Sequence, residues 1–268
     1  MKKYGSLFPP LVERIMQEER FSKNPDKTAK TRLHQIYGAY VRPNSNKKAA
    51  ALLEKFISSS LSMPTAQNFD IPDHKENDSV YEYICNMLTL HSSTNERLPY
   101  YNDFYDFIFG HTGAVKTIMD LGCGFNPFSL LFFPQLPTEY HAIDIDLHTK
   151  DLLNSFFEVM RLPKNATCED LAAINPILDV DLTLMLKLFP TLEANAPGRA
   201  YSLANELNTT WLVVTFPTKS LGGRKKGMEA YYRTSFLDEI GKNALSNFEL
   251  KAETVIGNEL VFILTKKP

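Results

Sequence analysis

The chain has 268 residues, of which 44% are hydrophobic and 22% are charged, a composition typical of a folded globular protein of one or two domains. No apolar run approaches the ~18 residues that a membrane-spanning helix needs, and Pro9, Pro10 and Glu13 interrupt the apolar stretch that a secretory signal would require. The three cysteines are too few and too scattered for a disulfide framework or a zinc site. We therefore expect a cytoplasmic protein without a membrane span or a bound metal.

The formal net charge of −2 hides an uneven distribution along the chain. Residues 1–60 contain twelve Lys and Arg side chains against five Asp and Glu, a net charge of +7, which leaves −9 for residues 61–268. A basic segment joined to an acidic body indicates that one part binds an anionic partner while another binds a different ligand. The whole-chain charge is therefore no argument against a nucleic-acid partner.

Apolar residues recur at helical spacing in three stretches of the first 60 residues, and prolines separate these stretches. Residues 58–79 are rich in Ser, Pro, Asn and Asp and are typical of a linker. We therefore predict a basic helical domain with its linker over residues 1–80, and a second domain over residues 81–268.

Helical spacing resumes at residues 80–90 and is followed by the polar stretch HSSTNER, residues 91–97. Ser93 and Glu96 have the spacing of a capping box, in which each side chain bonds a backbone amide of the first helical turn. We expect a helix that begins there, runs to about Phe109 and stops at Gly110.

From residue 115 onward, short apolar runs alternate with helix-length segments. Strands are expected at Thr117–Leu121, Tyr140–Ile145, just before Asp170, at Asp181–Leu186 and at Trp211–Phe216, with a final hairpin at Phe248–Val255 and Leu260–Thr265. Repeated strand-helix units that end in a hairpin predict an α/β fold with a mostly parallel, Rossmann-like sheet.

A glycine turn, Asp120 to Pro127, follows the first of these strands. Pro127 occupies the last glycine position of the dinucleotide fingerprint G-x-G-x-x-G, which disfavours NAD. Asp120 suits a cationic ligand, and Asp144, at the end of the next strand, is placed to bind a ribose diol. The combination favours S-adenosylmethionine, and the alternative is a glycine turn that binds no nucleotide.

Two further positions at the carboxyl ends of strands are candidates for this ligand. Asp170 and Leu171 follow the third strand, where a carboxylate and a backbone amide would meet an adenine; the alternative for Asp170 is a turn or helix cap. Lys187 follows the fourth strand and either faces the methyl donor or the target base, or simply emerges from the sheet.

The segment after the fifth strand, residues 216–229, places cations among glycines. Exposed amides and positive charges in such a loop suit a phosphate backbone, and a solvated surface loop is the alternative. Its cations are Lys219, Arg224, Lys225 and Lys226.

Several co-linear blocks resemble one family, the aminoglycoside-resistance 16S ribosomal RNA methyltransferases that methylate N7 of guanine 1405. The resemblance covers about residue 88 to the end and is weaker at residues 31–41. Its blocks are HSSTNER (91–97), NDFY (102–105), DLGCGFNP (120–127), YHAIDID (140–146), LKLFP (186–190), FPTKSLGGRKKGME (216–229) and IGNEL (256–260).

The resemblance implies roles for single residues. Arg97 would pair with the carboxylate of S-adenosylmethionine, while Gly122 would contact the donor through its backbone and Lys187 would lie near donor and target. The other donor-binding residues implied are His91, Ser93, Thr94, Asp144, Asp170 and Leu171. RNA would dock on the loop of residues 219–226 and on the basic helical domain, where Arg32, Lys47 and Lys48 are our candidates.

Guanine N7 carries an in-plane lone pair and no proton, so its methylation needs no general base. We therefore expect no catalytic dyad; alignment of the reactants and exclusion of water would suffice. The partner implied is 16S rRNA in the 30S subunit, with the enzyme a monomer. Two alternatives remain: a methyltransferase for another RNA site, a small molecule or a protein, and a ribosome-binding factor with a vestigial donor pocket.

Overall fold

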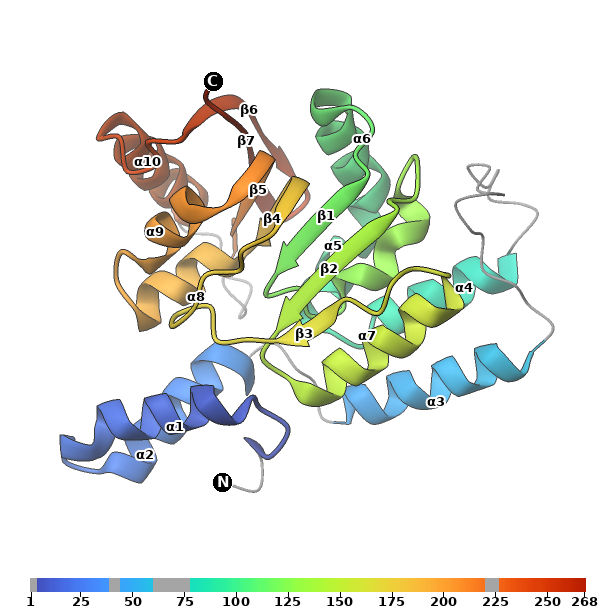
Figure 1. Cartoon of the computed structure of the whole chain (residues 1–268), viewed down its shortest axis with the longest axis horizontal. Helices are drawn as coiled ribbons and strands as arrows, with labels where there is room; N and C mark the ends of the chain where they lie inside the picture. Colours follow the sequence, from blue (N-terminus) through green and yellow to red (C-terminus); the bar gives the residue numbers. More distant parts are fainter. Residues whose placement is uncertain (1–3, 39–43, 60–77, 220–226) are drawn as a thin grey trace. The chain divides into compact units, whose positions relative to one another are not determined.

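A computed structural model describes residues 4–38, 44–59, 78–219 and 227–268 (Figure 1). Most of the predicted linker, residues 58–79, lies outside these ranges. The chain divides into two compact units, one formed by Met1–Leu98 with Gly122–Asp170 and the other by Pro99–Leu121 with Leu171–Pro268. Within the described ranges, no helix combines the length and the apolar character needed to cross a membrane.

The first unit begins with the predicted basic helices, drawn in blue in Figure 1. They are α1 (Pro9–Glu18), α2 (Pro25–Leu33), a π-helical turn (His34–Gly38) and α3 (Ser45–Ser58), followed by α4 (Asp78–Leu88). Proline at the start of α1 and α2 suits a position where no intrahelical donor is needed. Leu11, Ile15 and Leu33 lie on one side of these helices and form a buried cluster, against which Ile145 packs. The predicted helices are confirmed.

The rest of the first unit carries two strands and the helix between them. Its elements are α5 (Ser92–Arg97), a 3₁₀ segment (Asn126–Phe132), β2 (Glu139–Asp144), α7 (Leu147–Val159) and β3 (Ala166–Cys168). β2 and β3 are parallel, and Asp144 is in register with Cys168. The carboxylate of Asp146 caps α7 by accepting a hydrogen bond from the Thr149 amide at 2.8 Å.

The second unit contains five adjacent strands in the order β1-β4-β5-β7-β6. Its elements are α6 (Tyr101–Thr112), β1 (Thr117–Leu121), β4 (Asp179–Leu186), α8 (Leu188–Asn195), α9 (Arg199–Glu206), β5 (Asn208–Pro217), α10 (Met228–Gly241), β6 (Phe248–Ile256) and β7 (Glu259–Lys266). β1, β4 and β5 are parallel, whereas β7 runs antiparallel to β5 and β6. α8 and α10 pack against β5. The parallel strands and the final hairpin agree with the prediction.

Two local predictions are wrong. Ser93 does not cap α5: the extended residue before the helix is His91, so Ser93 already lies in the first turn, and among the described residues no side chain caps this helix. The predicted single helix is also divided, because Pro99 lies in a 3₁₀ turn between α5 and α6. α6 then continues through Gly110 to Thr112 and ends at Gly113, whose φ of +68° favours glycine.

Candidate functional site

The glycine turn after β1 adopts a backbone conformation that only glycine takes easily. Gly122 has φ of +66° and Gly124 has φ of +51°, both in the left-handed region. The Gly122 amide donates to the Ile143 carbonyl at 2.8 Å. A Cβ atom on Gly124 would lie 3.0 Å from Cε1 of His91, so a side chain there would displace the histidine ring. The turn therefore brings the backbone and the His91 ring into close approach.

Asp144 closes this turn from the end of β2. One carboxylate oxygen, Oδ2, accepts a hydrogen bond from the Gly124 amide at 2.8 Å, and Oδ1 accepts from the amides of Ile145 at 2.7 Å and Asp146 at 3.1 Å. Burial raises the pKa of Asp144 above its usual value, and these amide hydrogen bonds act in the opposite direction. The predicted ribose acid is thus held rigidly beside the glycine turn.

The HSSTNER segment lies in the same unit as the turn. Arg97 is buried, and its Nη1 donates to Oδ1 of Asn126 at 3.0 Å, which ties α5 to the glycine turn. The His91 ring stacks on Phe125 with ring centres 5.5 Å apart, and Oγ of Ser93 lies 2.9 Å from Nδ1 of His91. The structure thus brings Arg97, His91 and Ser93 together with the turn, as the resemblance implies.

Thr94 has a different place from its neighbours. Its side chain is fully buried, and its hydroxyl donates to the backbone carbonyl of Leu88 at 2.6 Å. It also lies within hydrogen-bond distance of the His91 carbonyl, at 3.2 Å. Thr94 therefore fixes the turn that carries His91.

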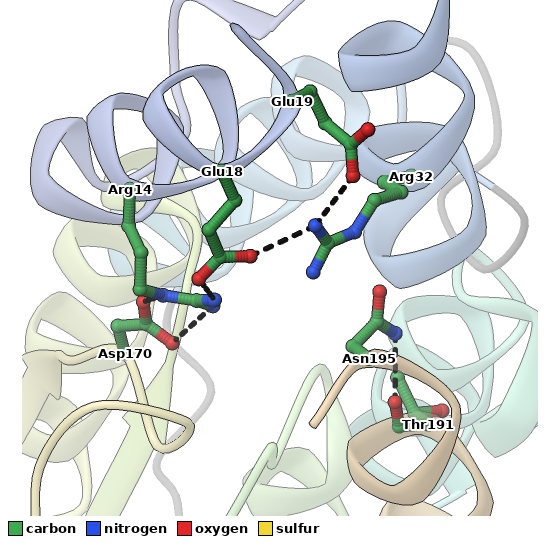
Figure 2. Close-up of polar contacts among 7 residues, drawn as sticks. All are labelled: Arg14, Glu18, Glu19, Arg32, Asp170, Thr191 and Asn195. Atoms are coloured by element: carbon green, nitrogen blue, oxygen red, sulfur yellow. Dashed lines mark hydrogen bonds and ion pairs between the residues drawn. The ribbon is translucent and has the colours of Figure 1, made fainter. Parts of the chain in front are cut away.

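Asp170 follows β3 and carries an ion pair that sequence reasoning missed. Nε of Arg14 lies 2.6 Å from Oδ2 of Asp170, and Nη2 of Arg14 donates to Oδ1 at 3.2 Å (Figure 2). Arg14 comes from α1, 156 residues earlier. No local pattern could have revealed this pair, because only the packing of α1 in this unit brings the two side chains together.

Asp146 is a second functional candidate that sequence reasoning missed. This fully buried carboxylate accepts hydrogen bonds from the hydroxyls of Ser6 at 2.5 Å and Tyr37 at 2.6 Å, and from the Asn46 amide group at 2.7 Å. Three separate N-terminal segments therefore converge two residues after Asp144. The only signal in the sequence is an aspartate placed to cap the helix that follows.

In the second unit, Lys187 follows β4 and takes a left-handed backbone conformation, with φ of +57°. Its amide lies 3.0 Å from Oγ1 of Thr215, and its ammonium lies 3.2 Å from Oε1 of Glu259. The Thr215 hydroxyl donates to Oε2 of the same glutamate at 2.9 Å. Lys187 therefore belongs to a buried group with Glu259, a residue of the IGNEL block that sequence reasoning did not single out.

Leu171, the predicted partner of Asp170, also belongs to the second unit. It is buried, and its carbonyl accepts a hydrogen bond from Nε of Arg199 at 2.8 Å. Arg199 further donates to the Ile174 carbonyl, so it holds the segment that follows Leu171.

The predicted RNA-binding residues differ in their surroundings. Lys47 and Lys48 are exposed in the first turn of α3, and Lys219 is half-buried just after β5. Arg32 is also half-buried, and its guanidinium pairs with Glu18 at 2.8 Å and with Glu19 at 2.7 Å. The remaining candidates, Arg224, Lys225 and Lys226, lie outside the described residues.

The residues gathered in the first unit fit a ligand that has a carboxylate, a ribose and an adenine. Arg97 offers a buried guanidinium for the first group, and Asp144 and Asp170 offer carboxylates for the other two. At Gly124 the missing side chain leaves room for the His91 ring beside the turn. In the ranges that the structure describes, no three His, Cys, Asp or Glu side chains form a cluster suited to a metal ion.

The chain is similar to known proteins over almost its whole length. A family model described as ribosomal RNA methyltransferase (FmrO) matches residues 1–263. A relative from Serratia marcescens, named 16S rRNA (guanine(1405)-N(7))-methyltransferase, is 36% identical over 269 residues, which span 99% of this chain and 94% of the relative.

Solved structures give the same picture. The crystal structure of the 16S rRNA methyltransferase RmtF in complex with S-adenosyl-L-homocysteine is 30% identical, has a TM-score of 0.80, and the match covers 98% of this chain and 93% of RmtF. The 16S rRNA methylase RmtB is 30% identical with a TM-score of 0.74, over 100% of this chain and 94% of RmtB. These matches confirm the predicted methyltransferase fold with its N-terminal helices.

Proposed function

Because the chain belongs to the ribosomal RNA methyltransferase (FmrO) family, we propose that it methylates N7 of guanine 1405 in 16S rRNA, with S-adenosylmethionine as the donor. The observation that carries the proposal is the full-length match to a 16S rRNA (guanine(1405)-N(7))-methyltransferase at 36% identity. The match to RmtF, which was solved with S-adenosyl-L-homocysteine, supports the choice of donor.

S-adenosylmethionine supplies a methyl group activated on a positively charged sulfur. In our proposal, the Arg97 guanidinium pairs with its carboxylate, Asp144 accepts hydrogen bonds from its ribose, and Gly122 contacts it through the backbone. Asp170 and Leu171 frame the adenine. His91, Ser93 and Thr94 shape the carboxylate end, either directly or through the turn that they stabilise.

N7 of guanine carries no proton, so no residue has to act as a base. The site residues have only to align the guanine with the methyl group and to exclude water from both. The product guanine carries a positive charge that the reactant lacks. A lone buried ammonium nearby would oppose that change, whereas Lys187 paired with Glu259 adds no net charge. This pairing supports our proposal that Lys187 lies close to the donor and the target base.

We further propose that residues 1–80 act as the RNA-docking domain and residues 81–268 as the methyltransferase domain. These two functional domains do not coincide with the compact units of the fold, because the unit that contains residues 1–98 also includes Gly122–Asp170. The RNA contacts proposed are Arg32, Lys47, Lys48, Lys219, Arg224, Lys225 and Lys226. The exposure of Lys47 and Lys48 on α3 supports this assignment.

The proposed substrate is 16S rRNA within the 30S subunit, modified in the cytoplasm by a monomeric enzyme. A bulky, positively charged base in the decoding site would repel a polycationic aminoglycoside, so the expected consequence is aminoglycoside resistance.

The test offers labelled S-adenosylmethionine with assembled 30S subunits, naked 16S rRNA or 50S subunits, and maps 7-methylguanine by reductive strand cleavage. We expect label in 16S rRNA of the 30S subunit and a single cleavage at guanine 1405. Label that is absent from 16S rRNA, or that maps to another base, would overturn the proposal. Turnover with a protein or small molecule in place of RNA would point to the alternative methyltransferase.

A further inference from the structure

The pair between Arg14 and Asp170 joins the basic helices to the proposed adenine site. Both oxygens of the Asp170 carboxylate accept from the guanidinium, through Nε at 2.6 Å and Nη2 at 3.2 Å. Only 21% of the Arg14 side chain and 7% of the Asp170 side chain are exposed, so water competes poorly for this pair. Two parallel contacts also fix the plane of the carboxylate.

The third nitrogen of the Arg14 guanidinium bonds Glu18 of α1, and Glu18 in turn bonds Arg32 of α2. Nη1 of Arg14 donates to Oε1 of Glu18 at 2.8 Å, and Oε2 of Glu18 accepts from Nη1 of Arg32 at 2.8 Å. Figure 2 shows the resulting series of side chains, with Glu19 as a second partner of Arg32. We call Arg32, Glu18, Arg14 and Asp170 the ion-pair relay.

We propose that Arg14 is a positioning residue for donor binding, and that the ion-pair relay couples RNA docking on the N-terminal helices to affinity for the donor. The inference rests on the function proposed above, in which Asp170 binds the adenine and Arg32 contacts RNA. It adds two residues, Arg14 and Glu18, that neither the sequence nor the resemblance assigned.

Arg14 acts through Asp170. This carboxylate stands in the connection after β3, and the two contacts with Arg14 hold its side chain in one orientation. Each carboxylate oxygen has two acceptor positions, so the ion pair with Arg14 leaves room for the exocyclic amine of an adenine. A side chain that is already fixed loses less conformational freedom when the ligand binds, and the affinity is correspondingly higher.

The ion pairs of the relay at Glu18 are weaker than the ion pair at Asp170. Glu18 is 43% exposed, so its ion pairs are weakened by water, whereas the pair at Asp170 is shielded. RNA that binds the N-terminal helices in the arrangement seen here favours the intact relay, and the donor favours the same arrangement. Two ligands that stabilise one arrangement bind with positive coupling, and the coupling is reciprocal.

A second contact strengthens this link. The hydroxyls of Ser6 and Tyr37 bond Asp146, whose own amide donates to Asp144, the proposed ribose acid. The N-terminal helices are therefore anchored beside both ends of the adenosine site, at Asp146 and at Asp170. A shift of these helices would disturb both anchors.

The first experiment measures the affinity of the full-length protein for S-adenosylhomocysteine by isothermal titration calorimetry, without ribosomes. We expect Arg14→Gln to weaken binding about five- to tenfold. Arg14→Lys keeps the charge but loses the paired contacts, and should fall between the wild type and Arg14→Gln. The matched control is Arg20→Gln, which removes an exposed charge near the end of the same helical segment and should leave the affinity unchanged.

The second experiment repeats the measurement with labelled S-adenosylhomocysteine and saturating 30S subunits, by equilibrium dialysis. The wild type should bind this ligand about tenfold more tightly when subunits are present. Glu18→Ala keeps the Arg14–Asp170 pair but cuts the relay, so it should lose most of this enhancement while weakening ligand binding alone by no more than about twofold. Subunit affinity should rise by the same factor when the ligand is present.

The outcomes separate this inference from the proposed function. If the wild type binds S-adenosylhomocysteine and methylates 30S subunits while Arg14→Gln binds the ligand as tightly as Arg20→Gln, the inference is wrong and the function stands. Equal enhancement by subunits in the wild type and in Glu18→Ala would refute the relay. A wild type that binds no S-adenosylhomocysteine overturns both. Melting curves of each variant show whether a lost affinity reflects unfolding. Arg14→Lys keeps the charge, so its affinity for S-adenosylhomocysteine tests the role of Arg14 even if Arg14→Gln fails to fold.

Discussion

The ammonium of Lys187 lies 3.2 Å from the Glu259 carboxylate, and both side chains are more than nine-tenths buried. Removing one member of such a pair leaves the other as an uncompensated buried charge, which costs about 3–5 kcal/mol. We therefore expect Glu259→Gln to lower the free energy of unfolding by several kcal/mol, measured by urea denaturation, although the Gln side chain still accepts from Thr215.

The double variant Lys187→Met with Glu259→Gln removes both charges and is the control for this prediction. It should be more stable than Glu259→Gln alone, because no unpaired charge remains. Because we propose that Lys187 lies close to the donor and the target base, we expect this double variant to lose methyl transfer to 30S subunits although it is folded. A double variant less stable than Glu259→Gln would contradict the role of the buried pair.

Replacing Gly124 by alanine should weaken donor binding. The φ of +51° costs a non-glycine residue about 1–2 kcal/mol, and the new Cβ would stand 3.0 Å from the His91 ring. The backbone strain is present with and without the ligand, so it should lower the free energy of unfolding by about 1–2 kcal/mol, measured by urea denaturation. The displaced His91 ring should in addition weaken the affinity for S-adenosylhomocysteine several-fold, measured by calorimetry.

Gly110→Ala is the matched control for Gly124→Ala. Gly110 is an exposed position inside α6, and nothing lies within 4 Å of a Cβ atom there. Because alanine favours a helix interior more than glycine does, this variant should gain about 0.5–1 kcal/mol of stability and keep its donor affinity. Equal affinity of the two variants would show that the glycine turn does not hold the donor.

Two aspartates should affect stability in opposite directions as the pH changes. Burial raises the pKa of Asp144 above its ordinary 3.8, so its contribution to stability is complete below 3.8 and is lost as the pH rises through the folded-state value. The free-energy difference between the wild type and Asp144→Asn should therefore decrease as the pH rises from below 3.8 toward neutrality.

Asp181 provides the opposite case. Burial alone would raise its pKa, but hydrogen bonds from the amides of Lys116 and Thr117 outweigh burial and lower it. Its contribution is present above 3.8 and is lost as the pH falls through the lower folded-state pKa. Urea unfolding between about pH 3 and pH 7 should show the wild-type advantage over Asp181→Asn growing with pH. The same pH trend in the stability loss of Asp144→Asn and of Asp181→Asn would contradict the opposite pKa shifts of the two aspartates.

Reversing the charges of Lys47 and Lys48 tests the docking surface. Each neutralised phosphate contributes roughly −0.7 to −0.9 to the slope of log affinity against log salt concentration. The variant Lys47→Glu with Lys48→Glu should therefore bind 30S subunits with a slope reduced in magnitude by about 1.4 to 1.8 and methylate them more slowly. Its affinity for S-adenosylhomocysteine without subunits should not change.

The control for this surface reverses two other exposed lysines, Lys164 and Lys242. It changes the net charge of the protein by the same amount at positions outside the N-terminal helices. A similar loss of subunit binding in both double variants would mean that overall charge, and not this surface, decides docking.

Local sequence was sufficient to predict most elements and the glycine turn of the candidate site. The strand at Thr117–Leu121 was predicted with its observed bounds. The turn that follows it could be predicted from its two glycines, and Asp144 from its place at the end of the next strand. The predicted capping box is absent because α5 begins at Ser92, with His91 at its N-cap, and Ser93 contacts the His91 ring instead. The spacing of Ser93 and Glu96 alone does not reveal this start.

The sequence by itself determined the order of helices and strands, the glycine turn and the uneven charge, because periodicity, backbone freedom and composition are local properties. Only the tertiary structure decided that Arg14 meets Asp170, that Lys187 meets Glu259 and that Asp146 gathers three N-terminal segments. Such contacts join residues far apart in the chain, and the free energy of each depends on the burial that packing creates around it.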